Sequence, residues 1–115
     1  MHELGIVVHI IRTVEEIAKE NNAKKVGKVV LEIGQVSGIV HRYLTDCWKW
    51  SVKKTEILQD CELVIEPIEA FTLCEDCHAL YSTVKYAKIC PECQSENTYL
   101  YCGNEMNIKE IEILE

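Results

Sequence analysis

Hydrophobic positions in the first twenty residues recur every three or four residues, which is the period of an α-helix with one buried face. The opposite face carries charged side chains, and the pattern stops at Asn21-Asn22. The sequence therefore predicts an amphipathic helix that begins almost at residue 2. Its expected buried positions are Leu4, Val7, Val8, Ile11, Val14, Ile17 and Ala18.

The pattern then changes to a period of two, which is typical of a β-strand. Val29, Leu31 and Ile33 are expected on the buried face of a strand that stops at Gly34, and a loop follows. Helical spacing returns between residues 41 and 54, with Trp50 off the main apolar stripe. The stripe of this second helix consists of Leu44, Cys47, Trp48 and Val52.

Two further strands are expected in the second half of the chain. In residues 61–68, Cys61, Leu63 and Ile65 share one face, and Pro67 marks the end of the strand. Residues 106–114 alternate again, but the phase shifts at Lys109-Glu110, which suggests a β-bulge.

The expected order is helix, strand, helix, strand, an excursion, and a final strand. This order favours an α+β fold with a small three-stranded sheet and two helices, into which a cysteine-containing lobe is inserted. We expect residues 1–70 and 104–115 to form an α/β domain and residues 71–103 to form a separate lobe, joined by short necks near Ala70 and Gly103.

Four cysteines give the lobe its chemistry. They form two Cys-x-x-Cys pairs separated by twelve residues, and this spacing lets four sulfurs converge on one tetrahedral metal ion. Four thiolates leave no open coordination position, so the pattern predicts a structural zinc site and argues against zinc-dependent hydrolysis. The expected ligands are Cys74, Cys77, Cys90 and Cys93.

Composition limits the class of protein, its cellular compartment and its partners. The 115 residues fit one small domain, whose folded state a bound metal ion would stabilise considerably. An odd count of seven cysteines, no apolar stretch long enough to span a bilayer and no basic leader favour a cytoplasmic protein. The net charge of −7 opposes binding to nucleic acid. We found no nucleophile with an adjacent base and no phosphate loop, so no enzymatic role is expected.

The N-terminal sequence Met1-His2-Glu3 suggests a second metal site. The α-amine of Met1, the backbone nitrogen and imidazole of His2, and the backbone nitrogen of Glu3 can form a square plane, a geometry typical of Ni(II) or Cu(II). The same three residues can also occur by chance, with Glu3 only favouring the start of the helix through its charge.

Several segments together resemble the HypA (HybF) family. They are Met1-His2-Glu3-Leu4, Val30 to Gly34 followed by Ser37 to Val40, the two Cys-x-x-Cys pairs with Pro91, and Gly103 to Met106 leading into the last strand. The resemblance covers the whole chain. It implies a nickel metallochaperone for the maturation of [NiFe]-hydrogenase and, in some organisms, of urease, with nickel at residues 1–3 and structural zinc at the four cysteines.

The resemblance also implies partners. These are a nickel-handling GTPase of the hydrogenase maturation pathway, the hydrogenase large subunit and, in some organisms, urease accessory proteins. From the acidic charge and the short apolar stretches we expect no nucleic-acid partner and no membrane. The chain would act as a monomer or as a weak or element-swapped homodimer. It departs from the family pattern at His78 and Cys102, which place an extra imidazole and an extra thiol near the zinc lobe.

Other readings stay open. A rubredoxin-like iron protein also uses paired cysteines, although the glycines that usually follow such pairs are missing here, and a zinc ribbon could serve as an interaction module. His41, His78 and Cys102 are alternative or assisting nickel ligands. Cys47 and Cys61 are expected in the core, and Tyr99 and Tyr101 in a strand that packs on the lobe.

Overall fold

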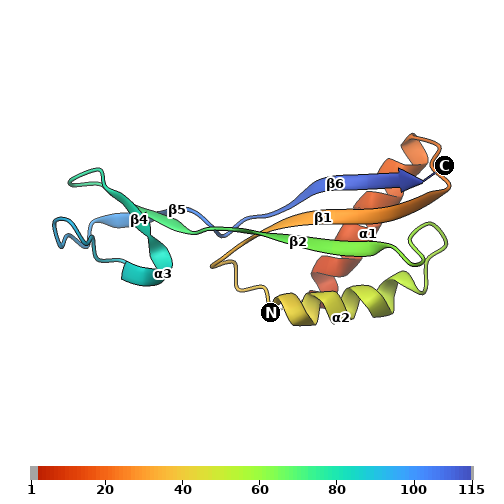
Figure 1. Ribbon diagram of the computed structural model, residues 1–115, viewed down its shortest axis with the longest axis horizontal. Coiled ribbons are helices and arrows are strands. Elements are labelled where there is room, and N and C mark those ends of the chain that lie inside the picture. Colours follow the sequence, from red (N-terminus) through yellow and green to blue (C-terminus); the bar gives the residue numbers. More distant parts are fainter. Residues whose placement is uncertain (1–2, 115) are drawn as a thin grey trace. The chain divides into compact units, whose positions relative to one another are not determined.

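The computed structural model describes residues 3–114 (Figure 1). Contacts within the chain divide it into two compact units. The described residues of the first unit are 3–32, 39–66 and 107–114, and those of the second are 33–38 and 67–106. The elements are α1 (Glu3–Glu20), β1 (Lys25–Gly34), α2 (His41–Val52), β2 (Glu62–Ile68), β3 (Phe71–Cys74), β4 (Leu80–Ser82), α3 (Thr83–Tyr86), β5 (Thr98–Cys102) and β6 (Met106–Leu114).

A three-stranded sheet with the order β2-β1-β6 forms the centre of the first unit, and α1 and α2 run along it (Figure 1). The α+β class and the two helices confirm the sequence prediction. The middle strand β1 is the most deeply buried one, since it has a neighbour on both edges. The fully buried side chains of the two helices and β1 in this unit are Val7, Ile10, Val14, Ala18, Val26, Val29, Leu31, Leu44 and Trp48.

The buried face of α1 differs from the one that the sequence predicts. Ile10 is fully buried, whereas Leu4 and Val8 remain 47% and 38% exposed. The apolar stripe of α1 is wider than the surface that covers it, so its flank opens into a shallow groove of about 310 Å³ that Trp50 also lines. The prediction of buried Leu4 and Val8 is therefore wrong.

A buried tryptophan joins α2 to the start of β2. The Trp48 indole Nε1 donates a hydrogen bond to the carbonyl oxygen of Cys61 at 3.0 Å, so its polar atom is satisfied inside the core. Cys61 is buried, as predicted, but Cys47 is only half-buried. None of the helices in the described part of the chain is long and apolar enough to cross a membrane.

The second unit has a sheet of its own, which the sequence pattern did not reveal. Strand β3 pairs antiparallel with β4 and with β5, and Leu73 lies opposite both Leu80 and Tyr99. Strands of three to five residues are too short to show a clear alternation. Tyr99 and Tyr101 do lie in a strand, but both are exposed, contrary to expectation.

The segment 33–38 pairs with both necks of the lobe and belongs to the second unit. The Gln35 amide donates to the carbonyl oxygen of Ile68, and the Val36 amide donates to that of Gly103, both at 2.8 Å. The Gln35 side chain also accepts a hydrogen bond from the Ala70 amide at 3.0 Å. The contact-based units thus divide at residues 66/67 and 106/107, while the division at 70/71 and 103/104 stays a prediction.

Candidate metal centres

Two turns of the same design carry the four cysteines. In the first, the His78 amide donates to the Cys74 carbonyl at 3.0 Å, and the Cys74 amide donates to the Ala79 carbonyl at 2.9 Å. In the second, Gln94 donates to the Cys90 carbonyl at 2.8 Å, and the Cys90 amide donates to the carbonyl of Ser95 at 3.0 Å. Each turn therefore presents two sulfurs on one side.

The residue after each second cysteine adopts a left-handed backbone conformation. His78 has φ of 65° and Gln94 has φ of 60°, values that glycine adopts most readily. Because side chains are tolerated at both positions, the absence of glycine does not prevent these turns. The missing glycines therefore do not by themselves separate a zinc site from an iron site.

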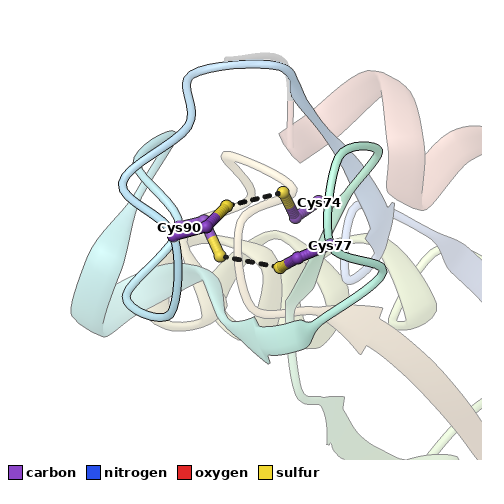
Figure 2. A group of neighbouring side chains, drawn as sticks. Cys74, Cys77 and Cys90 are labelled. Atoms are coloured by element: carbon purple, nitrogen blue, oxygen red, sulfur yellow. Dashed lines mark hydrogen bonds between the residues drawn. The ribbon is translucent and has the colours of Figure 1, made fainter.

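The structure brings the four predicted zinc ligands together. Their sulfurs all lie within 4.8 Å of one another, and Figure 2 shows Cys74, Cys77 and Cys90 pointing toward a common centre between the two turns. The Sγ atoms of Cys74 and Cys93, and those of Cys77 and Cys90, are 3.6 Å apart. A disulfide bond is far shorter, at about 2.05 Å.

This geometry fits a tetrahedral metal ion. Four sulfurs at about 2.3 Å from a central zinc lie roughly 3.8 Å from one another, which is close to the separations observed. Cys74 and Cys90 are buried, whereas Cys77 and Cys93 are exposed. Half of the cage is thus embedded in the lobe and half faces solvent.

The close packing of the four thiols gives them different pKa values. A backbone hydrogen bond from Cys77 lowers the pKa of Cys74 to about 7. The Ser95 amide lowers the pKa of Cys93 as well, but desolvation and the hydrogen bonds with the neighbouring cysteines outweigh it and raise the pKa to about 12. Four negative charges at this spacing require a cation, and a divalent metal ion supplies that charge.

A polar network holds the two turns together, and sequence reasoning did not find it. The Asp76 carboxylate, located between the first two cysteines, accepts hydrogen bonds from the Ser95 hydroxyl and, at 3.1 Å, from the side-chain amide nitrogen (Nδ2) of Asn97. These two bonds lower the pKa of Asp76, with Ser95 as the larger cause. The Glu75 amide adds a bond to the Asn97 carbonyl at 2.9 Å. The only signal in the sequence was the polar run after Cys93.

Of the predicted nickel ligands, Met1 and His2 lie outside the described residues. Glu3 is the first residue of α1, and its side chain is buried. Its carboxylate oxygen accepts a hydrogen bond from the backbone amide of Val40 at 3.1 Å. The start of α1 therefore lies against the start of α2. This contact joins residues 37 positions apart, so no local sequence pattern predicts it.

Among the described residues, the metal-binding cluster contains the four cysteines and none of the other candidate ligands. His41 is exposed and follows Val40 directly, and His78 is exposed in the first cysteine turn. The Cys102 thiol, half-buried, donates to the carbonyl oxygen of Glu69 at 3.6 Å. Burial, followed by the charge of Glu62, raises the pKa of Cys61 to about 11, which suits an inert core thiol.

The model of one protein family matches residues 1–113 of this chain, and that family is described as hydrogenase/urease nickel incorporation metallochaperones of the HypA type. The chain is 34% identical over 113 residues to the hydrogenase maturation factor HypA of Aquifex aeolicus, covering 98% of this chain and 97% of that protein. It is 35% identical to the hydrogenase maturation factor HybF of Proteus vulgaris, with 98% and 99% covered.

Solved structures of HypA proteins also match nearly the whole chain. The solution structure of the Ni metallochaperone HypA from Helicobacter pylori superimposes with a TM-score of 0.73 at 29% identity, over 99% of this chain and 98% of that one. A second solution structure of a HypA protein gives a TM-score of 0.76 at 29% identity, with 99% and 97% covered. Both units are therefore included in the match.

Proposed function

The chain belongs to the HypA family, and on that premise we propose that it binds Ni(II) through its first three residues and delivers the ion during maturation of [NiFe]-hydrogenase. The observation that carries the proposal is the extent of the family match. It spans residues 1–113, and so it includes both the Met-His-Glu start and the four cysteines. The role is binding and transfer and involves no catalysis.

Zinc is the resident ion of the lobe in this proposal. Cys74, Cys77, Cys90 and Cys93 supply four thiolates whose spacing suits tetrahedral Zn²⁺. The ion supplies structural stability, because the lobe has only a small buried cluster of Cys74, Tyr81 and Cys90 with Ala79 packed against it. A closed set of four thiolates has no position for a cargo ion, so nickel needs another site.

The Met1 amine, the His2 backbone nitrogen and imidazole, and the Glu3 backbone nitrogen form that second site. Four nitrogens in a plane suit Ni(II) and disfavour Zn²⁺, which prefers a tetrahedron. The two sites thus select different metals by donor type and geometry. Nickel binding releases protons from the amine and the amides, so affinity falls as the pH decreases.

Delivery requires partners. We propose that the chain acts in the cytoplasm with a nickel-handling GTPase and passes nickel to the hydrogenase large subunit. Where a urease is present, its accessory proteins are further acceptors. This proposal rests on the family name, which includes both hydrogenase and urease, and on curated relatives named hydrogenase maturation factors.

Calorimetric titration of Ni(II) into the zinc-loaded, untagged protein tests the proposal. Wild type should bind one nickel ion per chain, and His2→Ala should lose this binding while it keeps one zinc per chain. Equal nickel binding by both proteins would show that the ligands lie elsewhere. Metal analysis of the purified protein tests the zinc assignment, because a tetrathiolate iron site is red and a zinc site is colourless.

A further inference from the structure

We propose that a pocket in the second unit binds a segment of another protein that carries an apolar side chain beside a carboxylate. The pocket has a volume of about 270 Å³, and all of its lining residues belong to the second unit. They come from β3, α3, β5, the residues just after α3 and the segment 33–38. None of the four cysteines lines it, so the proposal does not depend on either metal site.

One wall of the pocket is a face of the small sheet. Thr72 in β3 lies opposite Leu100 in β5, and side chains that are directly opposite one another share a face. Thr98 precedes Leu100 by two residues, so it lies on that face as well. The second wall consists of α3 and the two residues that follow it, Ala87 and Lys88.

Hydrogen bonds hold the two walls in place. The Thr72 and Thr83 hydroxyl oxygens are 2.7 Å apart and join β3 to α3. The Thr98 hydroxyl donates to the carbonyl oxygen of Lys88 at 2.8 Å and joins β5 to the residue that follows Ala87. The Ala87 amide donates to the Thr83 carbonyl, also at 2.8 Å. The pocket is therefore formed before a ligand arrives, and binding requires little ordering of the protein.

The polar groups of the pocket can serve as hydrogen-bond donors. The hydroxyls of Thr72 and Thr83 share one hydrogen bond, which uses one of their two protons and leaves the other for a ligand. Lys88 adds a positive charge, and no acidic residue lines the pocket. Val36 and Leu100 contribute apolar surface. A ligand that matches this lining has an apolar body and a negatively charged acceptor.

The local charge also favours an acidic ligand. Residues 77–91 contain two lysines, Lys85 and Lys88, and no aspartate or glutamate, although the whole chain has a net charge of −7. Both lysine side chains are exposed. This part of the surface is therefore complementary to carboxylates on a partner.

Size and position favour a polypeptide over a free small molecule. Small-molecule sites commonly have volumes of about 300–1,000 Å³, so this pocket suits a single side chain. In the sheet order β4-β3-β5, β5 is an edge strand, along which an extended segment can lie and form main-chain hydrogen bonds. Tyr99 lines the pocket and is 45% exposed, and tyrosines often contribute strongly to binding at protein interfaces.

Titration of the zinc-loaded, isotope-labelled protein with three capped tripeptides, followed by NMR, tests the proposal. Glutamate-leucine-glutamate should shift the amide signals of Val36, Thr83, Lys88, Tyr99 and Leu100, and the shifts should saturate. Glutamate-serine-glutamate lacks the apolar side chain and lysine-leucine-lysine reverses the charge, so each should bind at least about 10-fold more weakly. Equal binding of the three peptides, or no saturable shift at these residues, would overturn the inference.

Matched variants test the named residues. Lys88→Glu should weaken binding of glutamate-leucine-glutamate by about 10-fold, whereas Lys85→Glu, which makes the same charge change outside the pocket, should weaken it by less than about 3-fold. Tyr99→Ala should likewise cost about 10-fold, and Tyr101→Ala, in the same strand but outside the pocket, should bind like wild type. All four positions are exposed, so each variant should keep its zinc. Equal effects within either pair would contradict the assignment.

Two further measurements distinguish other occupants. Isocaproate has a leucine-like body and a carboxylate but no peptide backbone, so it should bind at least about 10-fold more weakly than glutamate-leucine-glutamate. Equal affinity would assign the pocket to free small carboxylates and overturn the proposal. Sedimentation should show the same oligomeric state for wild type and Lys88→Glu. A dimer that this variant abolishes would assign the pocket to a second copy of the chain and also overturn the proposal.

Discussion

The backbone of Gly103 passes so close to Gly34 that a β-carbon on Gly34 would lie 2.0 Å from the Gly103 carbonyl oxygen. Gly103 in turn has φ of +114°, and a β-carbon on it would lie 2.4 Å from the Cα of Ala70. The end of β1 and both necks of the lobe are therefore packed backbone against backbone. Only glycine leaves room for this contact.

Gly34→Ala should destabilise the protein by on the order of 3 to 5 kcal/mol, because the backbone of Gly103 and Asn104 must move away from the new β-carbon. Gly38→Ala is the matched control. Gly38 also has a positive φ, of 80°, but a β-carbon there meets nothing within 4 Å, so its cost should be about 1 to 2 kcal/mol. Urea unfolding of both variants measures the difference, and equal costs would contradict the close contact.

Cys74→Ser should lose zinc and unfold the lobe from Phe71 to Asn104, while the helices and the sheet of the first unit persist. Structural zinc contributes apparent free energies of roughly 10 to 16 kcal/mol in small peptides, which a lobe of this size cannot replace by apolar burial. Limited proteolysis and zinc analysis provide the measurement. Cys102→Ser, outside the cluster, should keep its zinc and remain resistant to protease.

Trp48→Phe should lower the free energy of unfolding by about 2 to 3 kcal/mol. It removes the donor to the Cys61 carbonyl and leaves a buried acceptor without a partner, with a small void beside it. Trp50→Phe should change stability by less than about 0.5 kcal/mol, because Trp50 is 56% exposed. Thermal or urea unfolding of the two variants separates these outcomes.

The pKa of Cys61 predicts a loss of stability in alkali. Its folded pKa of about 11 exceeds the ordinary value of 9.0, so above pH 9 the unfolded chain loses the thiol proton first. Stability should therefore fall between pH 9 and 11, and be unaffected by this group below pH 9. The effect should be about 1 to 2 kcal/mol, since solvent screens part of the interaction. Unfolding of wild type and Cys61→Ala across this range measures it, and parallel pH profiles would contradict it.

One residue added before Met1 should weaken nickel binding about as much as His2→Ala. The extension converts the α-amine into an amide and moves His2 from the second position of the chain to the third, which would break the fused chelate rings of the proposed site. Zinc content and thermal unfolding should not change. The comparison uses the same calorimetric titration, and an extended protein with wild-type nickel affinity would exclude the amine as a ligand.

Local patterns were sufficient to predict most elements of the first unit. The spacing of apolar residues predicted α1, α2 and the three strands, and the final strand was placed at residues 106–114, as observed. The paired cysteines likewise predicted a common metal centre, because two residues between cysteines suffice to turn both sulfurs to one side. In these cases the determining interactions lie within a few residues of each other.

Tertiary structure decided the features that depend on distant segments. Periodicity shows that α1 has an apolar face, but only packing shows that Ile10 is covered and Leu4 is not. The bond from Val40 to Glu3 and the bonds from Ser95 and Asn97 to Asp76 join residues 19 to 37 positions apart. The sequence does not indicate which residue a hydrogen-bonding side chain will contact, because the partner is determined by how the chain folds back on itself.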